Sequence, residues 1–108
     1  MTHEYIDSPL ARAELDAMTG PVVVEFGTNW CGYCIGAQPL ISPALSAVAA
    51  VSHLKIEDGP GRPLGRSFRV KLWPTLIFMR DGRELARVVR PNARAEIDEA
   101  LQKITAPA

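Results

Sequence analysis

The feature that most restricts the fold of this chain is a short apolar run at residues 22–26, Val-Val-Val-Glu-Phe, bounded by a Gly-Pro pair and by Gly27. Successive side chains of a strand point to opposite faces, so this run is typical of a strand buried on both faces, as in a parallel sheet. Such strands are covered by helices on each side. The run therefore predicts an α/β fold with residues 22–26 as one of its buried strands.

Helix signals surround this strand. Ser8-Pro9 predicts a helix start, with serine as the N-cap and proline in the first turn. A longer helix is expected from the cysteine pair to about residue 50, and it contains Pro39 and Pro43. Interior prolines remove backbone hydrogen bonds, so we expect a kink there or a restart at Ser42-Pro43. Two further helices are expected, a short one at residues 64–68 and a last one capped by Asn92.

The other strand signals complete the predicted sheet. Residues 4–6, 53–57, 75–79 and 84–90 favour strands, and Asp81-Gly82 is a typical hairpin turn between the last two. Alternating strands and helices followed by a hairpin predict an α/β fold with a central mixed sheet of four to five strands and helices on both faces. We expect a single domain that occupies residues 1–108.

Chain length and charge exclude several other classes of protein. The 108 residues, of which 47% are hydrophobic, suffice for one core. Lysine plus arginine equals aspartate plus glutamate, at 12 each, so no overall field attracts nucleic acid. The first residues lack the basic and apolar regions of a signal peptide, and the longest apolar stretches are too short to span a membrane. We therefore expect a cytoplasmic monomer that binds neither nucleic acid nor membrane.

Both cysteines of the chain lie in one motif, Trp30-Cys31-Gly32-Tyr33-Cys34, where the buried strand gives way to a helix. Two intervening residues allow the two sulfurs to meet in a small ring. The start of a helix carries unpaired N–H groups and a positive dipole end, which favour a thiolate at Cys31. Cys34, one turn further, is shielded and can attack a disulfide formed at Cys31.

Two alternatives for the cysteine pair are a metal site and a structural crosslink. Structural zinc needs about four ligands, and the chain offers only His3 and His53 besides the two cysteines. A disulfide across so short a loop would stabilise the fold by only about 2 kcal/mol. A redox-active pair is the expected interpretation, with no metal and no bound cofactor.

Taken together, these motifs resemble the thioredoxin family over about residues 5–104. The apolar strand leads into the Cys-x-x-Cys motif, Pro39 follows Cys34 by five residues, and Asp81-Gly82 matches the last hairpin of that family. The segment 70–76, Val-Lys-Leu-Trp-Pro-Thr-Leu, is similar to its cis-proline segment. The resemblance implies a thioredoxin fold and a thiol-disulfide oxidoreductase.

The resemblance also implies roles for individual residues. Cys31 would be the attacking thiolate, Cys34 the resolving thiol, and Pro74 a cis-proline that faces the disulfide. Trp73 would then offer its backbone to a substrate strand, and Trp30 and Trp73 would flank the disulfide. Packing in the core is the alternative for both tryptophans, and a trans proline at the start of a strand is the alternative for Pro74.

Glu25 is the most informative charged residue, because it lies inside the buried strand. A buried carboxylate is costly, so we expect its pKa to rise. The family carries an acid here, usually aspartate, that takes the proton of the resolving thiol, and the resemblance gives Glu25 this catalytic role. A Glu25 paired with a buried lysine such as Lys55 is the alternative.

The sequence departs from the family at positions expected to tune the redox chemistry. Gly32-Tyr33 stands between the cysteines, where ordinary thioredoxins have Gly-Pro and some disulfide isomerases have Gly-Tyr. Trp73 stands before the cis-proline, where members of the family more often have isoleucine, valine or threonine. The expected function is reduction of disulfides in protein substrates, with a disulfide reductase or a small thiol as electron donor. The alternatives are a disulfide isomerase or oxidase, and a non-catalytic redox-sensing module.

Overall fold

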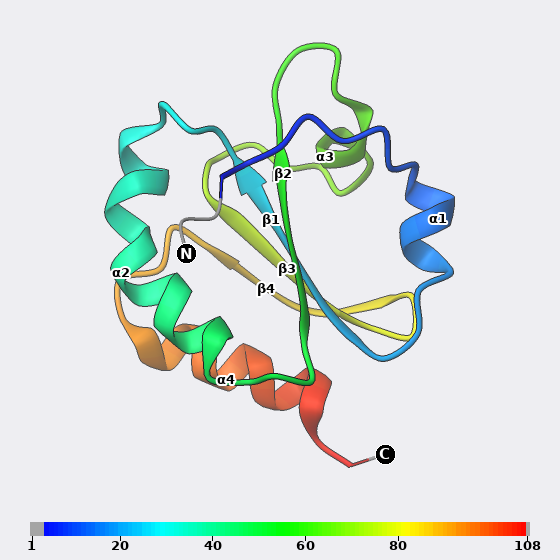
Figure 1. Cartoon of the computed structure of the whole chain (residues 1–108), viewed down its shortest axis with the longest axis vertical. Helices are drawn as coiled ribbons and strands as arrows, with labels where there is room; N and C mark the ends of the chain where they lie inside the picture. Colours follow the sequence, from blue (N-terminus) through cyan, green and yellow to red (C-terminus); the bar gives the residue numbers. More distant parts are fainter. Residues whose placement is uncertain (1–3, 108) are drawn as a thin grey trace.

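A four-stranded mixed sheet forms the centre of the molecule in the computed structural model, which describes residues 4–107 (Figure 1). The strand order is β2-β1-β3-β4, with β1 parallel to β2 and antiparallel to β3, and with β4 antiparallel to β3. The strands are β1 (Pro21–Gly27), β2 (Ser52–Glu57), β3 (Thr75–Arg80) and β4 (Arg83–Val89). A mixed sheet was predicted with four to five strands, and the structure has four.

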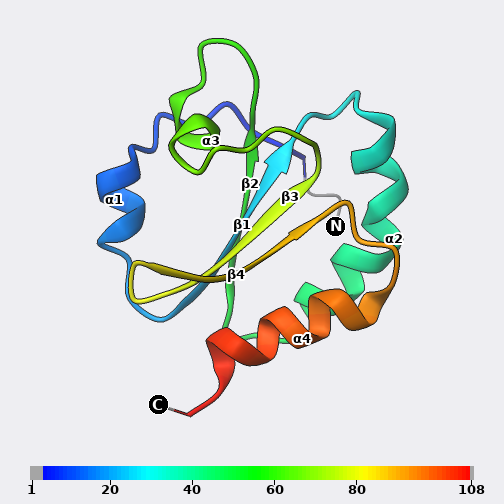
Figure 2. The same ribbon diagram turned by 180° about the vertical axis from the view of Figure 1, so that it is seen from behind.

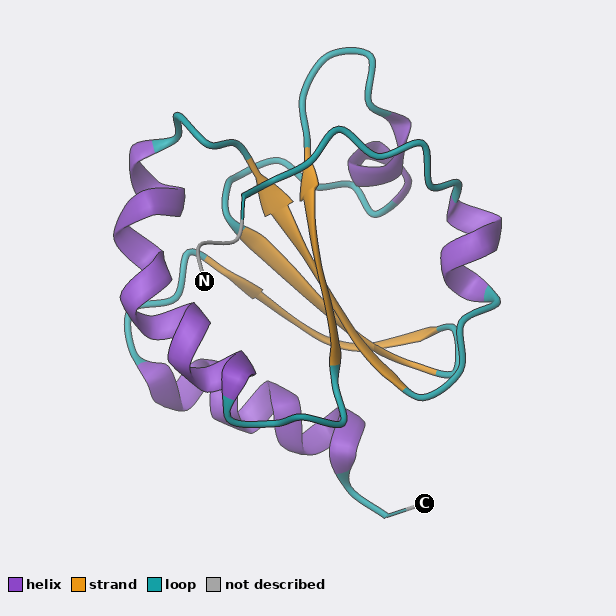
Figure 3. Ribbon diagram, in the orientation of Figure 1, coloured by secondary structure: helices purple, strands orange, loops and turns teal. Residues whose placement is uncertain are grey.

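Helices cover both faces of the sheet, as predicted. The longer helices α2 (Gly32–Ser46) and α4 (Arg94–Thr105) pack on one face. The short helices α1 (Arg12–Asp16) and α3 (Pro63–Ser67) pack on the other, where Leu15 and Leu64 enter a second core cluster. Figures 2 and 3 show the sheet between these two layers. Within the part of the chain that the structure describes, no helix is long and apolar enough to cross a membrane.

The alternation of β1 decides which side chains lie under the cysteine motif. Val22, Val24 and Phe26 belong to the cluster with α1 and α3, whereas Val23 belongs to the cluster with α2 and α4. Glu25 has the same parity as Val23, so its side chain points toward α2. Residues 22–27 are all buried, which confirms the prediction of a strand covered on both faces.

The N-terminal predictions were partly wrong. Residues 4–6 contribute a single parallel bridge between Ile6 and Ile56 rather than a strand. The first helix begins at Arg12 with Ala11 as N-cap, not at Ser8-Pro9. The Glu14 side chain accepts the N–H of Ala11 at 2.9 Å, so a residue inside the helix caps it, whereas Ser8 Oγ accepts the N–H of Leu10 at 3.2 Å ahead of the helix.

Helix α2 is continuous through both prolines, so no restart occurs at Ser42-Pro43. Pro39 and Pro43 are four residues apart and both exposed, which places the lost hydrogen bonds on the side of the helix that water reaches. The helix ends at Ser46, earlier than the predicted residue 50.

The C-terminal half follows the predicted order, with one wrong cap. Asp81 and Gly82 have φ values of 51° and 80°, as a two-residue hairpin turn requires. The N-cap of α4 is Ala93 instead of Asn92. Glu96 Oε2 accepts the backbone N–H groups of Asn92 and Ala93 at 2.6 and 3.0 Å, so a glutamate in the first turn performs the capping.

Candidate active site

The two cysteines lie where β1 leads into α2, with Cys31 as the N-cap residue of the helix. Cys31 Sγ accepts the backbone N–H of Cys34 at 3.3 Å, so the helix start donates to this sulfur as the motif predicts. Both residues are free thiols. Cys31 is 8% exposed and Cys34 is 1% exposed, which makes Cys31 the more accessible sulfur, although both are largely covered.

Cys34 lies in a small cluster with Tyr5, Cys31 and the partly buried Trp73. Burial, followed by the hydrogen bond with Cys31, raises the pKa of the Cys34 thiol to about 12. Gly27 provides the space for this packing, because a Cβ at this position would lie 2.6 Å from Cys34 Sγ and 2.8 Å from Tyr5 Cζ. Cys34 is therefore a protonated, enclosed thiol in the reduced protein.

Pro74 is buried, and the Trp73–Pro74 peptide bond is cis, as the resemblance implied. The Trp73 carbonyl accepts a hydrogen bond from Arg90 Nε at 2.8 Å. The indole Nε1 donates to Asp58 Oδ2 at 2.9 Å, which fixes the ring beside the cysteines. One backbone group of Trp73, its carbonyl, thus already has a partner inside the protein.

Aromatic side chains form an exposed rim around the cysteines. Trp30 is 74% exposed and meets Trp73 edge to face, with ring centroids 5.8 Å apart, so core packing of Trp30 is excluded. Tyr33 is 64% exposed, and the Arg90 guanidinium lies 3.7 Å from its ring centroid. Arg90 therefore contacts both the cysteine motif and the cis-proline segment. A Cβ at Gly32 would meet open space, so the structure imposes no steric demand for glycine there.

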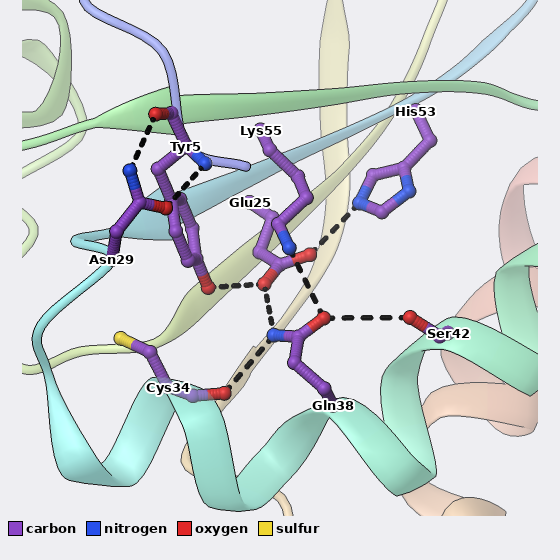
Figure 4. A network of polar contacts seen from close by, with 8 residues as sticks. All are labelled: Tyr5, Glu25, Asn29, Cys34, Gln38, Ser42, His53 and Lys55. Carbon is purple, nitrogen blue, oxygen red and sulfur yellow. Dashed lines mark hydrogen bonds and ion pairs between the residues drawn. The ribbon is translucent and has the colours of Figure 1, made fainter. Parts of the chain in front are cut away.

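Glu25 is completely buried on the α2 side of β1, near Cys34, and is held by three side chains (Figure 4). The hydroxyl of Tyr5 and Nε2 of Gln38 both donate to Oε2, the latter at 2.9 Å, and His53 Nε2 lies 2.8 Å from Oε1. Burial alone would raise the pKa of Glu25, but the hydrogen bonds from His53, Tyr5 and Gln38 together lower it. The prediction of a raised pKa was therefore wrong, and Glu25 is a carboxylate at neutral pH.

Lys55 is buried and faces the same region as Glu25, its neighbour across the β1–β2 ladder. Its ammonium donates to Gln38 Oε1 at 3.2 Å and lies 4.6 Å from the centroid of the Tyr5 ring. Within the described residues, the link from Lys55 to the carboxylate runs through Gln38, so the alternative of a Lys55–Glu25 pair takes the form of a bridged contact (Figure 4).

Several site residues were not identified from the sequence. His53 lies opposite Val23 in the β1–β2 ladder, so its side chain points to the same face of the sheet as Val23 and Glu25. Gln38 follows Cys34 by one helical turn in α2. These two signals were available in the sequence. Tyr5, Asp58 and Arg90 come from a segment and loops distant in the chain, and no sequence pattern linked them to the cysteines.

The metal alternative involved His3 and His53, of which His3 lies outside the described residues. Among residues 4–107, no group of three or more histidine, cysteine, aspartate and glutamate side chains could hold a metal ion. The imidazole of His53 is engaged with Glu25.

Comparison with known proteins agrees with this architecture. The thioredoxin family model matches residues 10–103. The chain superposes on the reduced form of thioredoxin 2 from Pseudomonas aeruginosa PAO1 with a TM-score of 0.85 and 56% identity, covering 96% of each chain. It is 29% identical to thioredoxin Asp f 28 of Aspergillus fumigatus, over 94% of this chain and 93% of that protein.

A shorter similarity reaches a different kind of protein. Over 65 residues the chain is 42% identical to protein disulfide-isomerase A2 of Pongo abelii, covering 56% of this chain and 12% of that protein. The whole-chain matches and the geometry of the Cys31–Cys34 pair lead to one conclusion. The chain belongs to the thioredoxin family and is a thiol-disulfide oxidoreductase with a Cys-x-x-Cys active site.

Proposed function

We propose that this protein reduces disulfide bonds in other proteins, with Cys31-Gly32-Tyr33-Cys34 as its active-site sequence. Cys31 is the attacking thiolate and Cys34 the resolving thiol. The observation that carries this assignment is the difference between the two sulfurs. Cys31 Sγ accepts an N–H group of the helix start and is the more exposed sulfur, whereas Cys34 is 1% exposed with a raised pKa.

The reaction transfers two electrons in two exchange steps. Cys31 thiolate attacks a substrate sulfur, a mixed disulfide forms, and the first substrate thiolate leaves and takes up a proton. Cys34 then loses its proton and attacks Cys31 Sγ, which releases the second substrate thiolate and leaves Cys31–Cys34 oxidised. A disulfide reductase or a small thiol supplies the two electrons that restore the dithiol.

Resolution requires a proton acceptor for Cys34, and Glu25 is proposed for this role. Two contributions that raise the Cys34 pKa come from Cys31, its hydrogen bond and its charge, and both change once Cys31 is bonded to substrate. The Glu25 carboxylate is ionised at neutral pH and completely buried, and the Tyr5 hydroxyl lies between it and Cys34 (Figure 4). A base in such a position typically contributes about 10²–10⁴-fold to a proton transfer.

The rim residues are proposed to shape the approach of the substrate. The Trp30–Trp73 pair offers exposed aromatic surface beside the cysteines, and the Tyr33–Arg90 pair adds a second contact surface to the motif. Trp73 and Pro74 offer the backbone edge along which a substrate segment would align. We further propose that the protein acts as a single-domain monomer of residues 1–108 in the cytoplasm, without nucleic acid or membrane as partner.

Trapping of the mixed disulfide tests the assignment of the two sulfurs. Cys34→Ser should accumulate a covalent complex with a disulfide-bonded protein such as insulin, and peptide mass spectrometry should place the bond at Cys31. Cys31→Ser should form little complex, because Cys34 is enclosed. Equal trapping through Cys34 in the Cys31→Ser variant would overturn the assignment.

A disulfide isomerase or oxidase remains the second candidate. Two observations favour it, the Gly-Tyr pair between the cysteines and the 65-residue similarity to protein disulfide-isomerase A2. The reduction potential separates the two, because a reductase lies near about −270 mV and an isomerase near about −180 mV. A redox-sensing module without turnover would bind partners but would not catalyse repeated disulfide reduction.

A further inference from the structure

We propose that the Tyr5 hydroxyl carries the proton of Cys34 to Glu25 during resolution of the mixed disulfide, which makes Tyr5 a catalytic residue of that step. This inference rests on the proposed function, because it takes Cys34 as the resolving thiol and Glu25 as the proton acceptor. It adds the route by which the proton travels between them.

Tyr5 is held in place by two independent sets of contacts. Its backbone N–H donates to Asn29 Oδ1 at 2.8 Å, and Asn29 Nδ2 donates to the Tyr5 carbonyl at 3.1 Å. The next residue, Ile6, is fixed beside β2 by hydrogen bonds with Lys55 and Glu57. Tyr5 is 6% exposed, so its side chain is enclosed under the cysteine motif.

The phenol lies between the thiol and the carboxylate. The hydroxyl of Tyr5 donates a hydrogen bond to Glu25 Oε2 (Figure 4). A Cβ added at Gly27 would lie 2.8 Å from the Tyr5 carbon that bears this hydroxyl and 2.6 Å from Cys34 Sγ. Both atoms therefore border the same small space. Tyr5 and Cys34 also share one packed cluster, and each perturbs the ionisation of the other.

Among the described residues, Tyr5 and Gln38 lie between Glu25 and Cys34, and of these two Tyr5 can move a proton. Gln38 Nε2 donates to Glu25 Oε2 and to the Cys34 carbonyl at 3.0 Å, but an amide nitrogen does not release a proton at neutral pH, and its contact is with the backbone. A phenolic hydroxyl both donates and accepts. Tyr5 can therefore receive the thiol proton on its oxygen while its own proton passes to Glu25.

The balance of this step leaves Tyr5 unchanged. The Cys34 S–H bond breaks, a proton joins the Tyr5 oxygen, and the original hydroxyl proton joins the Glu25 carboxylate. The Cys34 thiolate attacks Cys31 Sγ and the substrate thiolate departs. Burial and the neighbouring Glu25 carboxylate raise the pKa of Tyr5, so the phenol passes the proton without resting as a phenolate.

The other groups that face the carboxylate set the background for a pH measurement. His53 contacts Oε1 from β2, Lys55 of the same strand reaches the network through Gln38, and Cys34 and Gln38 face it from α2. Since Glu25 remains ionised above its lowered pKa, an internal transfer should depend little on pH between about 6 and 9. Loss of the proton to solvent would instead speed resolution about tenfold per pH unit, because thiolate accumulates below the raised pKa of Cys34.

Stopped-flow reaction with dithiobis(nitrobenzoate) tests the relay, because each step releases one coloured thiolate. The first phase reports attack by Cys31 and depends on reagent concentration, and the second reports resolution by Cys34 and does not. Tyr5→Phe should slow the second phase at least tenfold, leave the first phase unchanged and make the second phase rise with pH. Thr105→Val, which removes a hydroxyl bonded to Leu101 far from the site, should change neither phase.

Three outcomes separate this inference from the proposed function. A normal second phase in Tyr5→Phe with a slow one in Glu25→Gln would overturn the role of Tyr5 and keep that of Glu25. Normal second phases in both variants would overturn both roles. If Tyr5→Phe did not fold, the first phase would also be lost. The pH dependence of the wild-type protein would then carry the test, because a second-phase rate that rises tenfold per pH unit contradicts an internal relay.

Discussion

Replacement of Gly27 by alanine is expected to destabilise the fold and to disturb Cys34 at the same time. The added Cβ would lie 2.6 Å from Cys34 Sγ and 2.8 Å and 3.0 Å from two atoms of the Tyr5 ring. Neither neighbour can swing away freely, because Cys34 is 1% exposed and Tyr5 is fixed by Asn29. Overpacking of a buried site typically costs about 1–3 kcal/mol.

Thermal unfolding followed by circular dichroism measures this cost. For a chain of this length, 1 kcal/mol corresponds to about 4–8 °C in Tm, so Gly27→Ala should unfold at least about 4 °C below wild type. Gly36→Ala is the matched control. Gly36 lies within α2, and a Cβ added there would meet open space. Glycine in a helix is less favourable than alanine by about 0.5–1 kcal/mol. The control should therefore raise Tm.

The two glycine variants are expected to change Tm in opposite directions, which makes the reasoning refutable. A Tm of Gly27→Ala equal to or above that of wild type would mean that the space beside Cys34 and Tyr5 is not tightly filled. In that case the close packing of the phenol and the thiol would also be in doubt.

Three further predictions concern the thiols, alkaline pH and the rim of the site. Iodoacetamide should alkylate Cys31 before Cys34 in the reduced protein, because Cys31 is more exposed and the Cys34 pKa is raised; peptide mass spectrometry that found Cys34 labelled first would contradict the assignment. The free energy of unfolding should fall above pH 9, because the Cys34 thiol ionises there in the unfolded chain but stays protonated to about pH 12 in the folded one. Chemical denaturation should show that this free energy falls by up to about 1.4 kcal/mol per pH unit, and by less in Cys34→Ser. Arg90→Gln should lower the free energy of unfolding by about 1 kcal/mol, because it loses the contact with the Tyr33 ring and the charged hydrogen bond to the Trp73 carbonyl; unchanged urea denaturation would refute this.

The strand at residues 22–26 and the cysteine motif could be predicted because their signals are local. An unbroken apolar run indicates a strand that is buried on both faces, and a Cys-x-x-Cys motif after such a strand places one sulfur at a helix start. Helix caps were less predictable. Glu14 and Glu96 accept the first backbone N–H groups from inside their helices, so Ser8 and Asn92 were not needed as caps.

The environment of Glu25 could be predicted only in part. Its burial followed from the strand, but its pKa depends on donors from three separate segments, Tyr5, Gln38 and His53. Desolvation considered alone gives the wrong direction, because the hydrogen bonds that oppose it arise from tertiary packing. The sequence indicated a strand at residues 4–6, and Ile6 does form a bridge beside β2, but no pattern indicated that Tyr5 would reach Glu25.

The reduction potential of the Cys31–Cys34 couple tests the proposed reductase most directly. Tyr33 supplies a backbone N–H near the helix start that proline would lack, and one added hydrogen bond to a charged sulfur is worth about 1.5–3 kcal/mol. Since about 30 mV corresponds to 1.4 kcal/mol, the potential should lie above the roughly −270 mV of thioredoxin and no higher than about −200 mV. Equilibration with glutathione buffers should give this value, and a lower one for Tyr33→Pro. A potential at or above about −180 mV, or failure of the two cysteines to form a reversible disulfide, would contradict the proposed reductase.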